Sequence, residues 1–181
     1  MDISEAQRDM RRGYMSGATG ILASSLAWAA ATACVYLLSP QQAVWVLFIG
    51  GALIYPASLL ISKVLGAPGS HTRGNPLAGL AGATTFWMIL SLPLAYVASI
   101  VQIEWFFPAM LLIIGGRYLT FGTIYGMRFY WVLGFALAGA GIALAMLNAQ
   151  PLVSAAAGSA IEFVFAIVAF VLHGRWAKQS A

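Results

Sequence analysis

Six apolar segments, each long enough to cross a lipid bilayer, constrain this chain more than any other feature. They cover residues 14–38, 43–65, 77–100, 103–123, 129–147 and 151–173. An α-helix rises 1.5 Å per residue, so about 20 residues span the ~30 Å hydrocarbon core. Only 8% of the residues are charged, whereas soluble domains have about a quarter. We therefore predict an all-α, polytopic membrane protein, a bundle of six transmembrane helices, and exclude a water-soluble domain.

The connections between these segments are short, with one exception. Polar, glycine or proline residues interrupt the apolar pattern at 39–41, 66–76, 102–104, 126–128 and 148–150. The stretch 66–76 is the connection long enough to have a conformation of its own. It is hydrophilic, contains three glycines and has no apolar anchor, so we expect a mobile loop that tolerates insertion.

Little of the chain lies outside the six segments. Residues 1–13 are mainly polar and are predicted to form a short amphipathic helix, and residues 174–181 form a tail. Ser4 and Gln7 have the spacing of a capping box, in which each side chain satisfies a backbone N–H at a helix start. The segment 14–38 is longer than the roughly 7 to 15 residues of a signal-peptide core, so we expect a retained membrane helix.

Basic residues are found at alternate ends of the segments. The first, third and fifth connections contain none, and one of these connections contains Glu104. The other segment ends carry Arg8, Arg11, Arg12, Lys63, Arg73, Arg128, Arg175 and Lys178. Because basic loops stay on the cytoplasmic side of a membrane, this alternation predicts that both termini are cytoplasmic.

Several functional classes find no support in the sequence. The net charge is +4, but the nine Lys and Arg residues are scattered, so we do not expect nucleic-acid binding. Cys34 is the single cysteine, which excludes an internal disulfide and a cysteine-based metal site. His71 and His173 are too far apart in sequence for a helix-borne zinc site, and no nucleophile or phosphate-loop motif occurs. We therefore predict no enzyme activity, no metal and no cofactor.

Glu162 is the acidic residue in the middle of an apolar segment. It lies 11 residues after Pro151 and 11 before His173. An ionised side chain at that depth costs at least ~2.5 to 3.5 kcal/mol, so such carboxyl groups are paired, protonated or exposed to water. Ser159 lies nearly one turn earlier on the same face and leaves room for water or another helix. Glu162 is either a proton- or cation-binding group or a neutral acid in a packed core.

Arg117 lies at a similar depth in the fourth segment. It is about 18 Å from Trp105 along a helix, and Glu162 is about 17 Å from Pro151 in a helix of the same direction. If these two helices are in contact, Arg117 pairs with Glu162 or shares a polar cavity with it, with Tyr118 and Thr120 as hydroxyl partners. The alternative is that Arg117 extends to the cytoplasmic headgroups.

Small residues recur at helical spacing, as at Gly134, Ala138 and Gly141. Small side chains let helices approach closely within lipid. We expect these faces to pack the helices of one bundle, with a homo-oligomer contact as the alternative. The lipid bilayer is the partner that the composition predicts directly.

A wider pattern of motifs resembles a known family. It consists of Ile103–Met110, Gly115–Thr120, Tyr125–Arg128 and Gly74–Leu77. Together these stretches resemble a family of small bacterial multi-pass membrane proteins classified as a domain of unknown function, and the resemblance covers nearly the whole chain. It implies a location in the bacterial inner membrane. It brings no activity, substrate or cofactor.

Two functions remain open at this point. A small channel or transporter would use Glu162 and Arg117 to line a polar path between helices. A structural or accessory membrane protein would use the same charges only to fix helix packing. A membrane-embedded enzyme would need a nucleophile and a base that the sequence lacks. Because so little of the chain lies outside the spans, we favour transport.

Overall fold

The computed structural model describes residues 1–179, and all regular structure in that range is helical. The α-helices are α1 (Ile3–Gly13), α2 (Ala18–Leu37), α3 (Pro40–Val64), α4 (Pro76–Val101), α5 (Phe106–Tyr125), α6 (Phe129–Met146) and α7 (Pro151–Gln179). Two 3₁₀ turns, η1 (Met15–Gly17) and η2 (Ile103–Trp105), precede α2 and α5. Six helices, α2 to α7, are long and apolar enough to cross a membrane, which confirms the predicted all-α class and the six spans.

The ends of the helices follow local sequence rules. Ser39 caps α3 with its side chain and Asn75 caps α4, and in both cases proline occupies the first helical turn. Gly126 ends α5 in the left-handed conformation, with φ of 60°. The last helix continues beyond the predicted apolar segment 151–173, through polar residues to Gln179.

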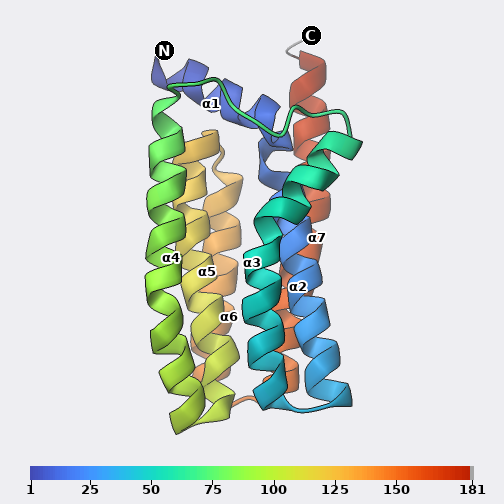
Figure 1. Cartoon of the computed structure of the whole chain (residues 1–181), viewed down its shortest axis with the longest axis vertical. Coiled ribbons are helices and arrows are strands. Elements are labelled where there is room, and N and C mark those ends of the chain that lie inside the picture. The colour runs from blue at the N-terminus through green and yellow to red at the C-terminus, as the bar shows by residue number, and fades with distance from the viewer. Residues whose placement is uncertain (180–181) are drawn as a thin grey trace.

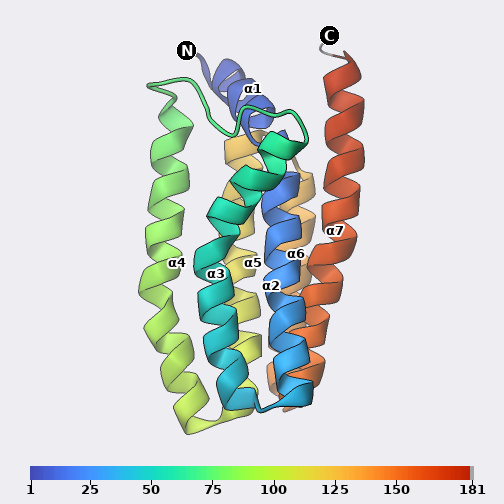
Figure 2. The ribbon, with the colours of Figure 1, turned by 45° about the vertical axis from the view of Figure 1, so that its right-hand side comes forward.

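The six long helices stand side by side, and α1 lies across one end of them (Figure 1). We call this the α1 end; the start of α1, the end of α7 and the connection 66–75 all lie there. The closest pairs are α5 with α6, α2 with α3 and α2 with α7, while α4 packs mainly on α5. Figure 2 shows α4 and α7 at opposite edges of the bundle.

Glycines explain why α5 and α6 approach so closely. A Cβ added at Gly115 would lie 2.7 Å from the Gly134 carbonyl oxygen, and one added at Gly141 would lie 2.8 Å from the Pro108 carbonyl oxygen. The two backbones are therefore in direct contact. In lipid, where apolar burial provides little drive for helix association, such close packing is a main source of stability.

The capping box at the start of α1 differs from the predicted one. Asp2, not Ser4, is the capping residue: its Oδ1 accepts from the Glu5 backbone N–H at 2.8 Å, and Glu5 Oε2 accepts from the Asp2 N–H at 3.0 Å. The pair has the same spacing as Ser4 and Gln7 but supplies two carboxylates, which the helix N-terminus favours. Gln7 instead donates to the Thr123 carbonyl of α5 at 2.8 Å.

The prediction of a mobile loop at 66–76 is wrong, because this connection is docked on α1. Asp9 accepts hydrogen bonds from Thr72 through both its backbone N–H, at 2.9 Å, and its hydroxyl, at 2.8 Å. Asn75 donates to Asp9 at 2.7 Å, and the Gly69 N–H donates to the Gly13 carbonyl at 3.0 Å. The anchors are hydrogen bonds between polar groups. The sequence argument considered only apolar anchors and therefore missed them.

Asp9 is the centre of this contact, and its ionised form is favoured. Burial acts to raise the pKa of Asp9, but the hydrogen bonds from Asn75 and Thr72 together lower it below the usual value. A carboxyl group with a lowered pKa in the folded state adds stability above its unfolded pKa of about 3.9. That stability is lost as the pH falls through the folded pKa.

Asp9→Ala should release the connection from α1. Hydrogen bonds to a charged group contribute about 1.5 to 3 kcal/mol, so local opening becomes roughly tenfold or more frequent. In detergent, trypsin should then cut after Arg73 at least tenfold faster than in wild type. Ser70→Ala, in the same connection, should leave the rate unchanged. Equal rates for both variants would contradict the docked connection.

Candidate functional site

Glu162 lies on a buried stripe of α7. The stripe has a helical spacing of three or four residues and contains Pro151, Ser154, Ala155, Gly158, Glu162, Ala166 and Ala169. Glu162 is the charged residue on it, and its exposed fraction is 0%. The stripe packs chiefly on α2, and α7 also contacts α5 and α6. The predicted mid-membrane acid therefore faces the interior of the bundle and not lipid.

Hydroxyl groups from two other helices approach the Glu162 carboxyl. Ser24 on α2 and Tyr118 on α5 are close enough to interact with it. Even so, neither carboxyl oxygen has a hydrogen-bond partner of standard geometry within residues 1–179. Both oxygens are also inaccessible to water. Burying an ionised carboxylate without donors costs far more than burying the neutral acid, so this arrangement favours protonated Glu162.

Arg117 contacts α4 and does not pair directly with Glu162. Its guanidinium donates to Thr85 Oγ1 at 3.1 Å and lies 3.5 Å from Met88 Sδ. The same group lies over the Phe121 ring, 5.2 Å from its centroid. Among the described residues, Arg117 and Glu162 form no hydrogen bond with each other; they interact only electrostatically, at longer range. Arg117 and Tyr118 are neighbours in sequence, so their side chains leave α5 about 100° apart and reach different helices.

Two of the predicted site residues lie outside this cluster. Thr120 Oγ1 donates to the Arg117 carbonyl of its own helix at 2.7 Å. Ser159 Oγ donates to the Ser25 carbonyl of α2 at 3.2 Å. Both hydroxyls thus satisfy helix backbone, a common use of Ser and Thr within membrane helices. Of the five predicted residues, the structure brings Tyr118 to Glu162 and places Thr120 and Ser159 elsewhere.

Trp28 and Ser154 belong to the same helix contact, although no motif marked them. The Trp28 ring is fully buried against Gly158: a Cβ at Gly158 would lie 2.7 Å from it. Trp28 Nε1 and Ser154 Oγ are buried without hydrogen-bond partners in the part of the chain that the structure describes. A signal did exist in the sequence, since Trp28 is the one bulky aromatic residue in a run of Ala and Ser.

Glu162, Trp28 and Ser154 together form what we call the α2–α7 seam. Ser154 lies one turn before Gly158 and Glu162 one turn after it, so the seam extends about 12 Å along α7. Each group has unused hydrogen-bonding capacity, which costs about 1 to 3 kcal/mol when buried. Such unpartnered groups are rare in native interiors.

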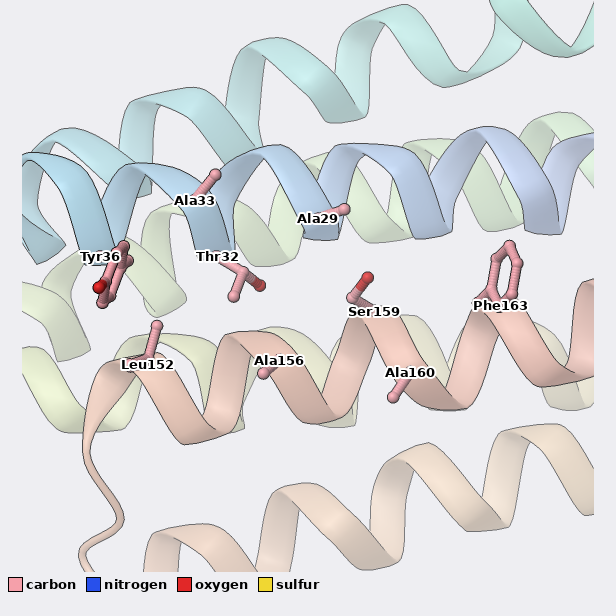
Figure 3. Close-up of a pocket in the computed structure, with 9 residues that line it drawn as sticks. All are labelled: Ala29, Thr32, Ala33, Tyr36, Leu152, Ala156, Ser159, Ala160 and Phe163. Atoms are coloured by element: carbon pink, nitrogen blue, oxygen red, sulfur yellow. The ribbon is translucent and has the colours of Figure 1, made fainter.

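An apolar groove lies between the same two helices (Figure 3). Its volume is about 510 Å³, and Ser159 lies on the side of α7 that faces α2. The lining residues are Ala29, Thr32, Ala33 and Tyr36 of α2 with Leu152, Ala156, Ser159, Ala160 and Phe163 of α7. Several of these side chains are small, so they do not fill the space between α2 and α7 at this point. The groove does not include Glu162.

The seam offers one carboxyl group, from Glu162, and hydroxyl groups such as that of Ser154. Within residues 1–179 no group of three or more His, Cys, Asp or Glu side chains could hold a metal ion. One carboxyl group and a few hydroxyls cannot supply the ligand number that divalent cations require. A single carboxyl can still exchange one proton.

Comparison with known proteins identifies the family of the chain but not its activity. The chain belongs to a family of unknown function (DUF7010), whose model matches residues 3–172. This confirms the resemblance to an uncharacterised multi-pass membrane family. No curated protein and no solved structure matches the chain.

Gly158→Ala tests the packing of the seam. The new Cβ would overlap the buried Trp28 ring, so we expect a loss of about 1 to 3 kcal/mol in the free energy of unfolding. Unfolding by SDS in mixed micelles measures it. Gly139→Ala on α6 is the matched control, because nothing lies within 4 Å of the added atom. If the two variants were equally stable, Trp28 would not be packed on Gly158.

Proposed function

We propose that the protein is a small membrane carrier in which Glu162 binds and releases a proton as a polar solute crosses the bundle. The main support for this proposal is the burial of the Glu162 carboxyl group. Both of its oxygens are inaccessible to water and have no hydrogen-bond partner among the described residues. We further propose that the chain lies in a bacterial cytoplasmic membrane with the α1 end inside.

The burial of Glu162 supports a carrier rather than an open channel. A permanent aqueous path would expose the carboxyl group, whereas both of its oxygens are inaccessible to water-sized contacts. A charge at this depth without a counter-ion or water costs several kcal/mol, so the proton can leave only after the seam has opened. Coupling of proton release to opening would make this a proton-coupled form of alternating access.

The α2–α7 seam supplies the candidate path for the solute. Trp28 Nε1, Ser154 Oγ and the Glu162 oxygens would gain hydrogen bonds when water or solute entered between the helices. These new hydrogen bonds would offset part of the free-energy cost of separating α2 from α7. In the closed state, the Trp28 ring on Gly158 lies between Ser154 and Glu162 and blocks the path.

A second candidate function is a structural or accessory membrane protein without transport. The dry environment of Glu162 favours it, because a neutral acid can simply pack between Ser24 and Tyr118. The two functions differ in whether Glu162 must lose its proton. A glutamine copies the shape of the neutral acid but has no proton to release.

Glu162→Gln should therefore abolish transport while preserving the fold. Purified protein in liposomes with an internal pH-sensitive dye is exposed to a panel of ammonium compounds, alkali cations and small neutral solutes. We expect solute-driven proton movement in wild type and at least a tenfold loss in Glu162→Gln, with unchanged thermal stability in detergent. Glu104→Gln, at the opposite end of the bundle, should behave as wild type. Absence of proton movement in wild type across the panel would favour the accessory function.

The distribution of charge supports the proposed orientation. Apart from Arg117, every Lys and Arg residue belongs to the α1 end, whereas the opposite end has Glu104. Basic residues are retained on the cytoplasmic side during membrane insertion.

The orientation is testable with single cysteines in a Cys34→Ala background. Cysteines at Gln42 and Gln150, both exposed at the opposite end, should react with an impermeant thiol reagent added to intact cells. A cysteine at the exposed Ser70 should react only after the membrane is opened. Labelling of Ser70 alone in intact cells would reverse the proposed orientation.

A further inference from the structure

A second pocket lies at the α1 end, away from the α2–α7 seam. Its volume is about 340 Å³, and it is formed where the end of α1, the residues after α3 and the last turns of α7 meet. Its lining combines Arg12, His173 and Trp176 with apolar residues. The apolar residues include Met15, Leu65 and Pro68.

The surroundings of this pocket are positively charged. No acidic side chain is among the residues that line it. Arg175 and Lys178 lie on the same last turns of α7 and are exposed. Of the acidic residues near this end, Asp2 and Glu5 cap the far end of α1, and Asp9 is bound by the connection after α3.

The two arginines at the end of α1 have different roles. Arg11 donates to the Tyr125 and Gly126 carbonyls at the end of α5, at 2.5 Å and 2.7 Å, and lies 5.6 Å from the Trp176 ring centroid. It therefore anchors α1. The Arg12 side chain is exposed and makes no hydrogen bond or ion pair among the described residues. Its guanidinium is available to an external anion.

The backbone beside the pocket is held in one conformation. Met15, Ser16 and Gly17 have successive positive φ angles of 49°, 55° and 81°. Ser16 is fixed on both sides: its carbonyl accepts from Tyr130, and its hydroxyl is hydrogen-bonded to His173 Nδ1 at 2.9 Å. This turn aligns the end of α1 with α7 and so sets the position of Arg12 relative to His173.

We propose that this pocket binds the headgroup of an anionic phospholipid. Charge complementarity supports this occupant, since Arg12 offers a planar donor set that matches a phosphate group. Leu65 and Pro68 of the lining follow directly after the span α3, and Trp176 is an aromatic residue of the kind typical of a membrane interface. A free phosphate would gain nothing from Met15, Leu65 and Pro68, whereas the first carbons of a lipid would be covered by them. This site is independent of the proposed proton carrier, because Glu162 does not line it.

Lipid-dependent stability tests the proposal. The detergent-purified full chain is titrated with dioleoyl phosphatidylglycerol or dioleoyl phosphatidylcholine, and its thermal unfolding is followed. We expect stabilisation by phosphatidylglycerol at lower concentration than by phosphatidylcholine. Arg12→Gln should raise the phosphatidylglycerol concentration at half-maximal stabilisation about fivefold, which is the effect of one basic residue near an anionic lipid. Arg12→Lys should retain part of the effect.

Arg73→Gln is the matched control, because Arg73 is an exposed basic residue at the same end but does not line the pocket. It should leave the phosphatidylglycerol midpoint unchanged. An equal loss in both variants would mean unspecific attraction to the basic surface and would overturn the site. Equal stabilisation by the two lipids would also overturn it. If inorganic phosphate alone reproduced the shift, the ligand would be a soluble anion and not a lipid.

Discussion

The hydrocarbon core of the bilayer offers no hydrogen bonds, and this constraint governs the structure. Each backbone N–H and C=O group within the membrane needs an internal partner, so the spans are helices. Helix association then depends on close packing, which Gly115 against Gly134 and Gly158 against Trp28 provide. Most hydroxyls follow the same rule, as Thr120 and Ser159 donate to backbone carbonyls. The Glu162 oxygens, Trp28 Nε1 and Ser154 Oγ are exceptions, since these buried atoms have no hydrogen-bond partner among the described residues.

The α1 end is organised by polar contacts instead. Outside the hydrocarbon, Asp9 bonds the connection after α3, and Arg11 bonds the end of α5. These contacts tie α1 to α4 and α5, while Arg12, which lies near α7, has no hydrogen-bond or ion-pair partner within residues 1–179. Water competes for hydrogen bonds at this end, so each contact contributes modestly and the set of them holds the helix. The result is a fixed cap with a basic pocket at its edge.

The two proposals use separate parts of the molecule. A proton carrier depends on opening between α2 and α7 deep in the bundle, whereas lipid binding depends on the static pocket at the α1 end. Both involve α7, since Glu162 lies in its middle and His173 and Trp176 lie near its end. A lipid that held the end of α7 would bias any movement of that helix, because a ligand shifts an equilibrium toward the state that it binds better.

The apolar segments by themselves determined the class, the number of spans and the depth of Glu162, because hydropathy and helical rise are local properties. The family resemblance also followed from sequence motifs alone. Side-chain partners depended on which helices touch and how each is rotated, and only the tertiary structure decided these. Arg117 reaches Thr85 because α5 presents that face to α4, although its depth matched Glu162. Likewise, Asp9 anchors the 66–75 connection because α1 folds back over the bundle, a contact between residues more than 60 positions apart.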